Sequence, residues 1–576
     1  MAALVLRSLA WLPGPASAGA DDPATRKLDK HLQAILQKAD KSAQRVLVQT
    51  AAGTGPSVAD SSRKKGRRAD QVGSSTDLLS MTVSGDELAE LANRPDVARI
   101  SSDAVVKPHG DVPASTGSAR HLLRTLGLAN GPWNGASTRV VVIDSGISLT
   151  LNFKSIIGFW DFTLADEFGN PLPPKKTGPV DDYGHGTHVA GLIADKGNHG
   201  EAAYRGVAPH VSLYGIKVLD REGQGFTSNV IRAIDFVVAN NAEYRFDVIN
   251  LSLGHPILEP ADTDPLVQAV ERAVRAGIVL VASAGNIGSN PETGVVAYGG
   301  LTSPGNAPAA ITVGAIDTRQ TTTRDDDVIP DFSSRGPTWF DGFLKPDIVA
   351  PGTNLVANVS SWSLLCRENP DLVVDTVKAD GDRAAYMRFS GTSMAAAVTT
   401  GVVAQMIDAN RRTWNKGRRA DGTEVASPLS PNTVKAILQY TALVMPAYDT
   451  LTQGAGAING EGAVRLATAI DTRAPADTWW LSPTVGPSYS TIGTTTYVWA
   501  SRIVWGDRVI WGGSLVWTDP SAWAARIVWG DALIGYDIGG EILWGDRIVW
   551  GDRVIWGDRV IWGDISQTLI ASDMLQ

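Results

Sequence analysis

Residues 389–397 read FSGTSMAAA, and the rest of the chain can be interpreted outward from this stretch. Small residues surround Ser393, and an apolar segment rich in alanine and valine continues to Gln405. The pattern predicts a tight loop leading into a buried helix, with Thr392 near the N-cap and Ser393 in the first turn. There the serine's backbone N–H is an unpaired donor of the helix, and the helix dipole favours negative charge. A nucleophile that generates an oxyanion needs both features, although an ordinary cap on a core helix has the same local pattern.

Length and composition limit the classes of protein to consider. The chain has 576 residues, too many for one average domain, and its apolar and charged fractions are those of a globular protein. A net charge of −9 argues against a nucleic-acid-binding protein. Cys366 is the single cysteine, which excludes an intramolecular disulfide and a cysteine-based zinc site. No stretch reaches the ~18 uninterrupted apolar residues of a membrane span.

The first 20 residues are predicted to be an export signal, with the alternative that they are not a signal at all. They hold a short apolar run and end in Ala-Ser-Ala at residues 16–18, which suits a signal peptidase. Arg7 interrupts the run, and a charged start is nearly missing. We expect a protein that is secreted or associated with the cell surface.

Residues 21–113 have the pattern of a small α+β unit. Ser84 is placed to cap a helix over residues 85–93, with Glu87 at the position of a capping box. The basic run at residues 63–68 is predicted to be a solvated loop, with a processing site or a polyanion contact as alternatives. Three segments are predicted to be strands: 45–50, 78–83 and 97–100.

From residue 114 to about 470 the pattern changes to alternating strands and helices, as a parallel α/β sheet requires. Residues 139–143 form an apolar run too uniform for a half-exposed strand, and Asp144 follows it. Open α/β sheets place their sites at the carboxyl ends of such strands, so Asp144 is a candidate site residue; the alternative is a turn cap. Further segments are predicted as buried strands, with a helix at 229–241: 214–219, 248–254 and a run from 278 that ends at Asn286.

Two more polar residues lie beside glycines at the ends of predicted elements. His185 lies between two glycines, which leaves its ring accessible, and an apolar helix follows. His188 is one helical turn further on, but no glutamate lies between the two as in zinc proteases, so we expect no metal there. We expect His188 to be a core histidine behind the site. Asn286 can donate a hydrogen bond into a cleft, although asparagine is also a common turn residue.

Together these four residues supply the groups needed for acyl transfer. The Ser393 hydroxyl is a poor nucleophile without a base, and His185 can take its proton. Asp144 can hold the imidazole tautomer and stabilise the imidazolium. Asn286 and the Ser393 backbone N–H can bind the oxyanion.

The order Asp, His, Ser along the chain is that of the subtilisins, and the resemblance extends further. The chain departs from the subtilisin-like family in two places. Ala397 and Val398 occupy positions that do no chemistry, where the family usually has a proline and a histidine. The His-Pro pair that usually follows Gly146 is also missing. Between residues 114 and 470 the chain closely resembles the subtilisin-like serine proteases in six segments: VIDSG (142–146), HGTHVAG (185–191), AGN (284–286), FSSRGP (332–337), KPDIVAPG (345–352) and GTSMA (391–395).

The resemblance implies where a substrate would bind. Ser252, Leu253 and Gly254 would form an edge strand of the cleft, and an extended peptide would pair with it through main-chain hydrogen bonds. Ala284 and Gly285 would line the pocket for the substrate side chain, which we expect to admit sizeable apolar residues.

The resemblance also implies that residues 21–113 are an inhibitory pro-segment that assists folding and is then removed, by a cut between about residues 106 and 118. The polar linker at residues 113–118 fits that boundary. Family members often bind structural calcium, and acidic loops such as the aspartates at 325–327 are present, but no complete ligand set can be assigned from the sequence.

A repeat runs through the C-terminal residues 471–576. From Trp505 onward WGDRVI recurs with a period of six, and nine of the 18 tryptophans follow it. An even period keeps each repeat position on one face of a strand, which the aromatic and β-branched content favours. The tail is either a small β-solenoid or a weakly folded segment that orders on a partner or is removed. We favour a tail that is ordered or that docks to a cell surface or partner, because regularly exposed tryptophans promote aggregation.

These observations predict a subtilisin-like α/β fold, with a parallel sheet flanked by helices, a preceding α+β pro-domain and a repetitive tail. The predicted function is that of a secreted serine endopeptidase, autoprocessed from a zymogen, that acts through an acyl-enzyme. Its expected partners are protein or peptide substrates and its own pro-segment, and its chemistry requires no cofactor. The alternative is an adhesin or structural protein whose tail carries the function and whose protease domain only matures it.

Overall fold

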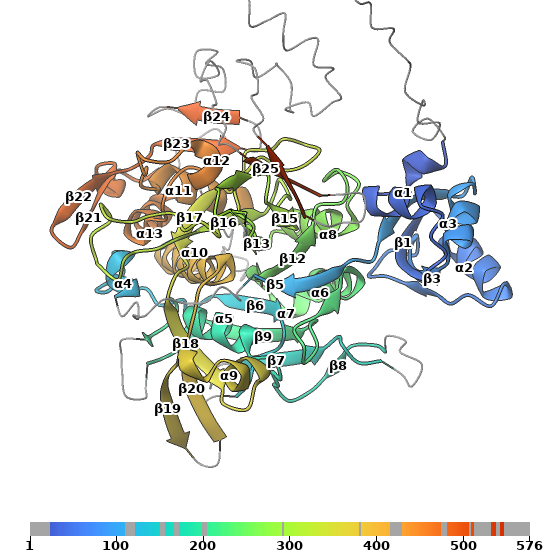
Figure 1. Cartoon of the computed structure of the whole chain (residues 1–576). Coiled ribbons are helices and arrows are strands. Elements are labelled where there is room, and N and C mark those ends of the chain that lie inside the picture. The colour runs from blue at the N-terminus through green and yellow to red at the C-terminus, as the bar shows by residue number, and fades with distance from the viewer. Residues whose placement is uncertain are drawn as a thin grey trace, which may run out of the picture. The chain divides into compact units, whose positions relative to one another are not determined.

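The structure is a computed structural model, and two compact units can be distinguished in it (Figure 1). One unit contains the described residues up to Gln71 together with Thr76–Ser102, and the other contains Val72–Ser75 and the described residues from Asp103 onward. The predicted signal, the 113–118 linker and most of the tryptophan repeat lie outside the described residues. The structure describes residues 23–109, 121–149, 156–165, 172–197, 204–290, 293–379, 382–414, 429–473, 481–505, 508–511, 532–536 and 542–546.

The first unit is an antiparallel sheet with three helices, as its α+β pattern predicts. The predicted capping box is present, because Ser84 and Glu87 exchange hydrogen bonds at the start of α3. The prediction of a loop for the basic run was wrong for its first residues: Arg63 and Lys64 form the last turn of α2, where cations complement the helix dipole. Arg67 forms an ion pair with Glu87 at 2.7 Å. The sheet order is β2-β3-β1-β4. The elements are α1 (Lys30–Gln37), β1 (Gln44–Thr50), α2 (Gly55–Lys64), β2 (Ala69–Gln71), β3 (Leu78–Val83), α3 (Gly85–Ala92) and β4 (Val97–Ser102).

The second unit is built on an eight-stranded sheet that is parallel except for its last strand, β8. The apolar run at 139–143 forms β6, which lies inside the sheet between β11 and β9 and is buried along most of its length. The carboxyl ends of parallel strands lie at one edge of a sheet, so this position sets Asp144 at that edge. In spatial order the strands are β17 (Ile348–Pro351), β16 (Ile311–Ile316), β13 (Val279–Ser283), β11 (Val248–Leu251), β6 (Arg139–Asp144), β9 (Ser212–Lys217), β7 (Ile156–Asp161) and β8 (Lys175–Lys176).

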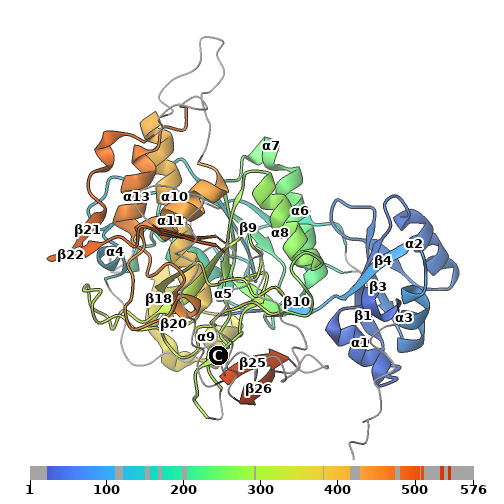
Figure 2. The same cartoon turned by 90° about the horizontal axis from the view of Figure 1, so that it is seen from above.

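Helices cover both faces of this sheet. The serine stretch leads into the buried helix α10 (Thr392–Trp414), which confirms that prediction, and α10 packs against α5 (His185–Ala194) and the central strands. Figure 2 shows α6 and α8 on the side of the sheet opposite α10 and α13. The other helices of this unit are α4 (Leu122–Thr125), α6 (Thr227–Ala239), α7 (Asn241–Tyr244), α8 (Pro265–Arg275), α9 (Leu364–Glu368), α11 (Pro431–Thr441), α12 (Thr450–Gln453) and α13 (Gly460–Ala469).

A second, antiparallel sheet of four short strands lies at the carboxyl edge of the large one. The segment predicted as a single strand at 248–254 is in fact two strands that separate at Ser252, β11 in the large sheet and β12 in the small one. At this point the Ser252 carbonyl accepts hydrogen bonds from the Ser393 hydroxyl at 2.9 Å and from the His109 N–H at 3.3 Å. In spatial order the strands of the small sheet are β10 (Gly225–Phe226), β5 (Val105–Pro108), β12 (Leu253–Pro256) and β15 (Thr302–Ser303).

The packed unit continues past residue 470. Trp499 is buried, its ring lies 6.2 Å from that of Tyr440, and the Arg502 guanidinium donates to the carbonyl of Gly454 at 2.8 Å. None of the helices in the described ranges is long and apolar enough to cross a membrane. The remaining strands are β14 (Ala297–Tyr298), β18 (Leu355–Ser360), β19 (Val373–Ala379), β20 (Asp382–Phe389), β21 (Tyr489–Ile492), β22 (Thr495–Val498), β23 (Arg502–Trp505), β24 (Arg508–Trp511), β25 (Ala532–Tyr536) and β26 (Ile542–Asp546).

Candidate active site

Asp144 and His185 are in direct contact. Asp144 Oδ1 lies 2.8 Å from His185 Nδ1 and accepts a second hydrogen bond, of 2.7 Å, from the Ser145 backbone N–H. Both side chains are fully buried. A buried carboxylate that accepts the Nδ1 proton fixes the imidazole tautomer and directs Nε2 away from the carboxylate.

Glycines allow the two elements to approach this closely. Gly184, just before α5, has φ +110°, in the left-handed region that favours glycine. A Cβ atom on Gly186 would lie 2.1 Å from the Gly146 carbonyl oxygen and 3.1 Å from the Asp144 Cβ. The glycines around His185 therefore bring the start of α5 against the end of β6.

Asp181, which sequence reasoning missed, ties the same two segments together. Its Oδ1 accepts bonds of 2.8 Å from the Ser145 hydroxyl and from the Gly184 N–H. Its Oδ2 accepts from the N–H and the hydroxyl of Thr187. Burial raises the pKa of Asp181. The signal that could have identified Asp181 is its position four residues before a predicted helix start, with serine and threonine nearby.

Ser393 and Asn286 are joined through Thr392. Asn286 Oδ1 accepts bonds of 3.0 Å from the Thr392 N–H and from its hydroxyl. Since Oδ1 takes these bonds, the Asn286 Nδ2 group is the branch of the amide that can donate elsewhere. The Ser393 hydroxyl donates to the Ser252 carbonyl at 2.9 Å, and the Ser252 hydroxyl donates to the Ser393 carbonyl at 3.1 Å.

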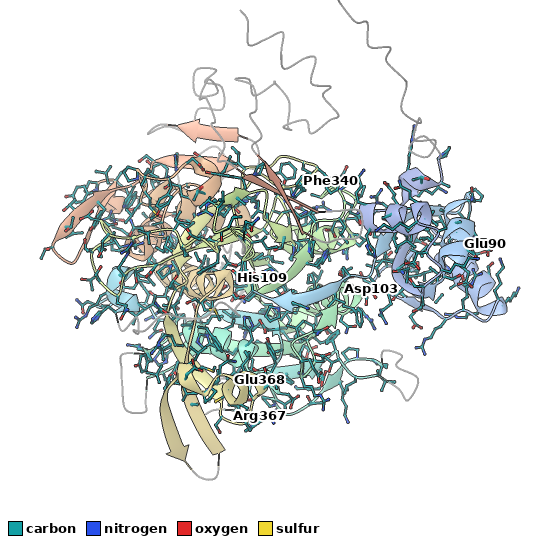
Figure 3. The ribbon with its side chains drawn as sticks, in the orientation of Figure 1. Glu90, Asp103, His109, Phe340, Arg367 and Glu368 are labelled. Carbon is teal, nitrogen blue, oxygen red and sulfur yellow. The ribbon has the colours of Figure 1, made fainter. Side chains whose placement is uncertain are left out.

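A peptide segment of the chain itself lies against Ser393. β5 pairs antiparallel with β12 and with β10, so Lys107 lies opposite Gly254 and Val106 opposite Gly225. Figure 3 shows Asp103 and His109 at the two ends of this strand. The predicted edge strand thus pairs with an extended peptide through main-chain hydrogen bonds.

His109, the residue after β5, makes the contacts closest to Ser393. Its carbonyl oxygen accepts the Ser393 backbone N–H at 3.2 Å. Its own N–H is shared between the Ser252 carbonyl at 3.3 Å and Ser393 Oγ at 3.1 Å. The carbonyl carbon of His109 therefore lies beside the hydroxyl of Ser393 and the helix N-terminus.

The predicted pocket residues Ala284 and Gly285 lie in different surroundings. Ala284 is buried in a small apolar cluster with Ile257 and Leu301. The Gly285 N–H donates to the Thr392 hydroxyl at 3.1 Å. The hydroxyl of Ser283, the residue before Ala284, lies 2.8 Å from His109 Nδ1. No local signal identifies Ser283, because it is the last residue of a strand that is buried at every position.

His188 is a core histidine, as predicted. Its Nε2 lies 3.0 Å from the Met387 carbonyl oxygen, its ring packs edge-on against Phe389, and it is fully buried. The described residues contain no group of three or more His, Cys, Asp or Glu side chains arranged to hold a metal ion. In the 325–327 loop, Asp327 instead forms an ion pair of 2.6 Å with Arg324.

His188 predicts a dependence of stability on pH. Burial, with the nearby His185, lowers its pKa to about 3. The unfolded chain therefore takes up this proton first, so stability is lost as the pH falls from about 6.5 towards 3. In a Ser393→Ala background, His188→Gln retains an N–H donor for Met387 but cannot be protonated. Its free energy of unfolding relative to the parent should rise by about 1.4 kcal/mol between about pH 7.5 and 5.5. Parallel stability curves in urea would contradict this assignment.

Comparisons with known proteins identify relatives of this chain. Residues 135–463 match the model of the Subtilase family. The chain is 33% identical to the serine protease AprX of Bacillus subtilis over 385 residues, which cover 66% of this chain and 76% of AprX. It is 30% identical to subtilisin E of B. subtilis over 345 residues, or 60% of this chain and 73% of that protein.

A solved structure has the same fold. Fervidolysin from Fervidobacterium pennivorans, a keratinolytic enzyme related to subtilisin, superposes with a TM-score of 0.54 at 19% identity. The match covers 74% of this chain, which spans 61% of the fervidolysin chain. It confirms the subtilisin-like α/β architecture, with a mixed, mostly parallel sheet flanked by helices. The extent of the family match, with the similarity to AprX, shows that this chain belongs to the Subtilase family and is a subtilisin-type serine protease.

Proposed function

We propose that the protein is a secreted serine endopeptidase, made as a zymogen, in which Ser393 is the nucleophile. His185 is its general base, Asp144 orients the imidazole, and Asn286 and the Ser393 N–H bind the oxyanion. The observation that carries the proposal is the 3.2 Å hydrogen bond from the Ser393 N–H to the carbonyl of a peptide bound along β12. An oxyanion donor is useful only where a carbonyl oxygen acquires charge.

In this mechanism Ser393 Oγ turns from the Ser252 carbonyl towards His185 Nε2 and gives up its proton as it bonds to the peptide carbonyl carbon. The carbonyl electron pair moves onto oxygen, which receives the Ser393 N–H and the Asn286 amide. As the tetrahedral intermediate collapses, the C–N bond breaks and the leaving amine takes the proton from His185. Water then attacks the acyl-enzyme by the same route and releases the carboxylic acid.

The proposed pro-segment, residues 21 to about 113, would inhibit by occupying the cleft as a substrate does. Two observations support this part of the proposal: β5 lies within the small sheet, and the Asp103 carboxylate binds the first turn of α6. The Asp103 carboxylate accepts from the Ser228 N–H at 2.8 Å and from its hydroxyl at 2.9 Å. A buried carboxylate at a helix N-terminus is favoured by the unpaired N–H groups and by the helix dipole.

Asp103→Ala should therefore weaken inhibition by the pro-segment. Loss of a side-chain acceptor at a helix N-terminus costs about 0.5–2 kcal/mol, so after self-cleavage the pro-segment should bind about 2- to 30-fold more weakly and activity should appear sooner. The measurement is the lag between cleavage, followed on gels, and hydrolysis of a chromogenic peptide. Asp60→Ala, which removes an exposed carboxylate from the same segment, is the matched control and should keep the wild-type lag. Equal lags for all three proteins would contradict the role of Asp103.

A fluorophosphonate probe tests the nucleophile itself. After self-processing is complete, peptide mapping should find one probe adduct, on Ser393, and none in Ser393→Ala. Ser488→Ala, which removes an exposed serine distant in sequence from the motif, should label like wild type. Labelling of Ser393→Ala to the wild-type level would overturn the assignment.

Secretion and a docking role for the tail complete the proposal. The apolar start of the chain and the tryptophan repeat support them. A truncation should retain residues up to 505, because Trp499 and Arg502 pack on the unit. If the truncated protein digests casein as the full chain does but no longer sediments with cells, the tail serves localisation. Unchanged sedimentation would refute a docking role.

A further inference from the structure

The ring of His109 is partly exposed and lies beside the carbonyl that Ser393 contacts, in a pocket that Ser283 and Gly254 form. Its Nδ1 lies 2.8 Å from the hydroxyl oxygen of Ser283. On another side, a Cβ atom added to Gly254 would lie 2.8 Å from His109 Cε1, so the absence of a side chain at Gly254 makes room for the ring. In a protease, the pocket that holds the residue before the scissile bond discriminates among substrates.

Ser283 gives this pocket a polar base. It lies at the carboxyl end of β13 and is fully buried. Within the described part of the chain, its hydroxyl has His109 as its hydrogen-bond partner and no other. A buried hydroxyl without a partner is unfavourable, so an apolar side chain in the pocket would leave Ser283 unsatisfied. An imidazole satisfies this hydroxyl and fills the remaining space with its ring carbons.

We propose that the pocket between Gly254 and Ser283 selects histidine immediately before the scissile bond, and that the chain's own first cut falls between His109 and Gly110. Ser283 is the specificity-determining residue. This inference rests on the proposed function and narrows it, since it names the substrate class and replaces our expectation of a pocket for sizeable apolar residues.

The charge of the ring supplies a second readout. Burial lowers the pKa of His109 to about 3, and the titratable groups that act in the same direction are His185 of α5 and His255 of β12. The pocket therefore holds a neutral ring, whereas a histidine in a free peptide is protonated below about pH 6.5. The preference for histidine over glutamine should decrease roughly tenfold between about pH 7.5 and 5.5. Any effect of pH on the enzyme itself is common to both substrates and cancels in the ratio.

The experiment uses the self-processed enzyme obtained from the full chain. Its substrates are acetyl-Val-Val-Lys-Pro-X p-nitroanilides, which copy residues 105–108 and place histidine, glutamine, phenylalanine or alanine at X. For the wild type, kcat/KM should be about tenfold or more higher with histidine than with phenylalanine. Ser283→Ala should lose most of this ratio, and Ser283→Thr, which retains the hydroxyl, should keep it. N-terminal sequencing of the wild-type mature enzyme, which depends on no variant, should begin at Gly110.

The outcomes distinguish a failure of the histidine pocket from a failure of the proposed protease function. A preference for phenylalanine, an unchanged ratio in Ser283→Ala, or a first cut at another bond overturns the histidine pocket and leaves the proposed protease intact. The histidine pocket is supported if the ratio of kcat/KM for histidine over phenylalanine falls in Ser283→Ala but not in Ser283→Thr, and if the mature N-terminus is Gly110. If the wild type hydrolyses none of the four peptides and no casein, the proposed function itself fails, and the inference fails with it.

Discussion

Ser393→Ala should abolish peptide hydrolysis, with kcat at least about 1,000-fold below that of the wild type. The reason is that the Ser393 Oγ is the atom beside the carbonyl of the bound peptide, and no other hydroxyl is expected to replace it as nucleophile. The fold should remain, because the methyl side chain of alanine fits where Ser393 is fully buried at the start of α10. The measurement is turnover of a chromogenic peptide together with the far-UV circular dichroism spectrum.

Two results are informative as controls for this variant. Ser488→Ala should retain wild-type turnover, which shows that serine removal in itself is harmless. Undiminished turnover by a well-folded Ser393→Ala protein would mean that the nucleophile lies elsewhere, and the proposed mechanism would have to be abandoned.

Asp144→Asn should reduce kcat by about 10,000-fold while KM changes little. An asparagine keeps the size of the side chain but can donate its N–H to His185 Nδ1, which stabilises the wrong imidazole tautomer and removes the charge opposite the imidazolium. The matched control is Asp182→Asn, at a partly exposed carboxylate 3.7 Å from Lys217. It should lose little activity. A loss in Asp182→Asn as large as that in Asp144→Asn would contradict a specific role for the Asp144–His185 hydrogen bond.

The sequence predicted the elements whose signals are local. The uniform apolar run before Asp144 becomes β6, the Ser84 and Glu87 pair forms its capping box, and the small residues around Ser393 lead into α10. Each of these patterns depends on residues a few positions apart, so propensity and spacing are sufficient to predict it.

The features that the sequence did not predict depend on contacts between distant segments. His109 meets Ser393 across 284 positions, and no local pattern around His109 indicates that its carbonyl lies at a helix N-terminus. Ser252, where β11 separates from β12, likewise bonds to Ser393 of α10 across 141 positions. The role of Ser283 could not be predicted either, because a serine in an apolar strand gives no sequence signal of the partner that its hydroxyl will bind.

Self-cleavage by Ser393 after the peptide that the cleft holds can be tested by the intact masses of purified wild-type and Ser393→Ala proteins prepared side by side. The wild type should be found as a species that begins at Gly110, and Ser393→Ala should retain the residues before that bond. A Ser393→Ala protein cut at the same bond, or a folded wild type that keeps its N-terminal segment, would contradict the account.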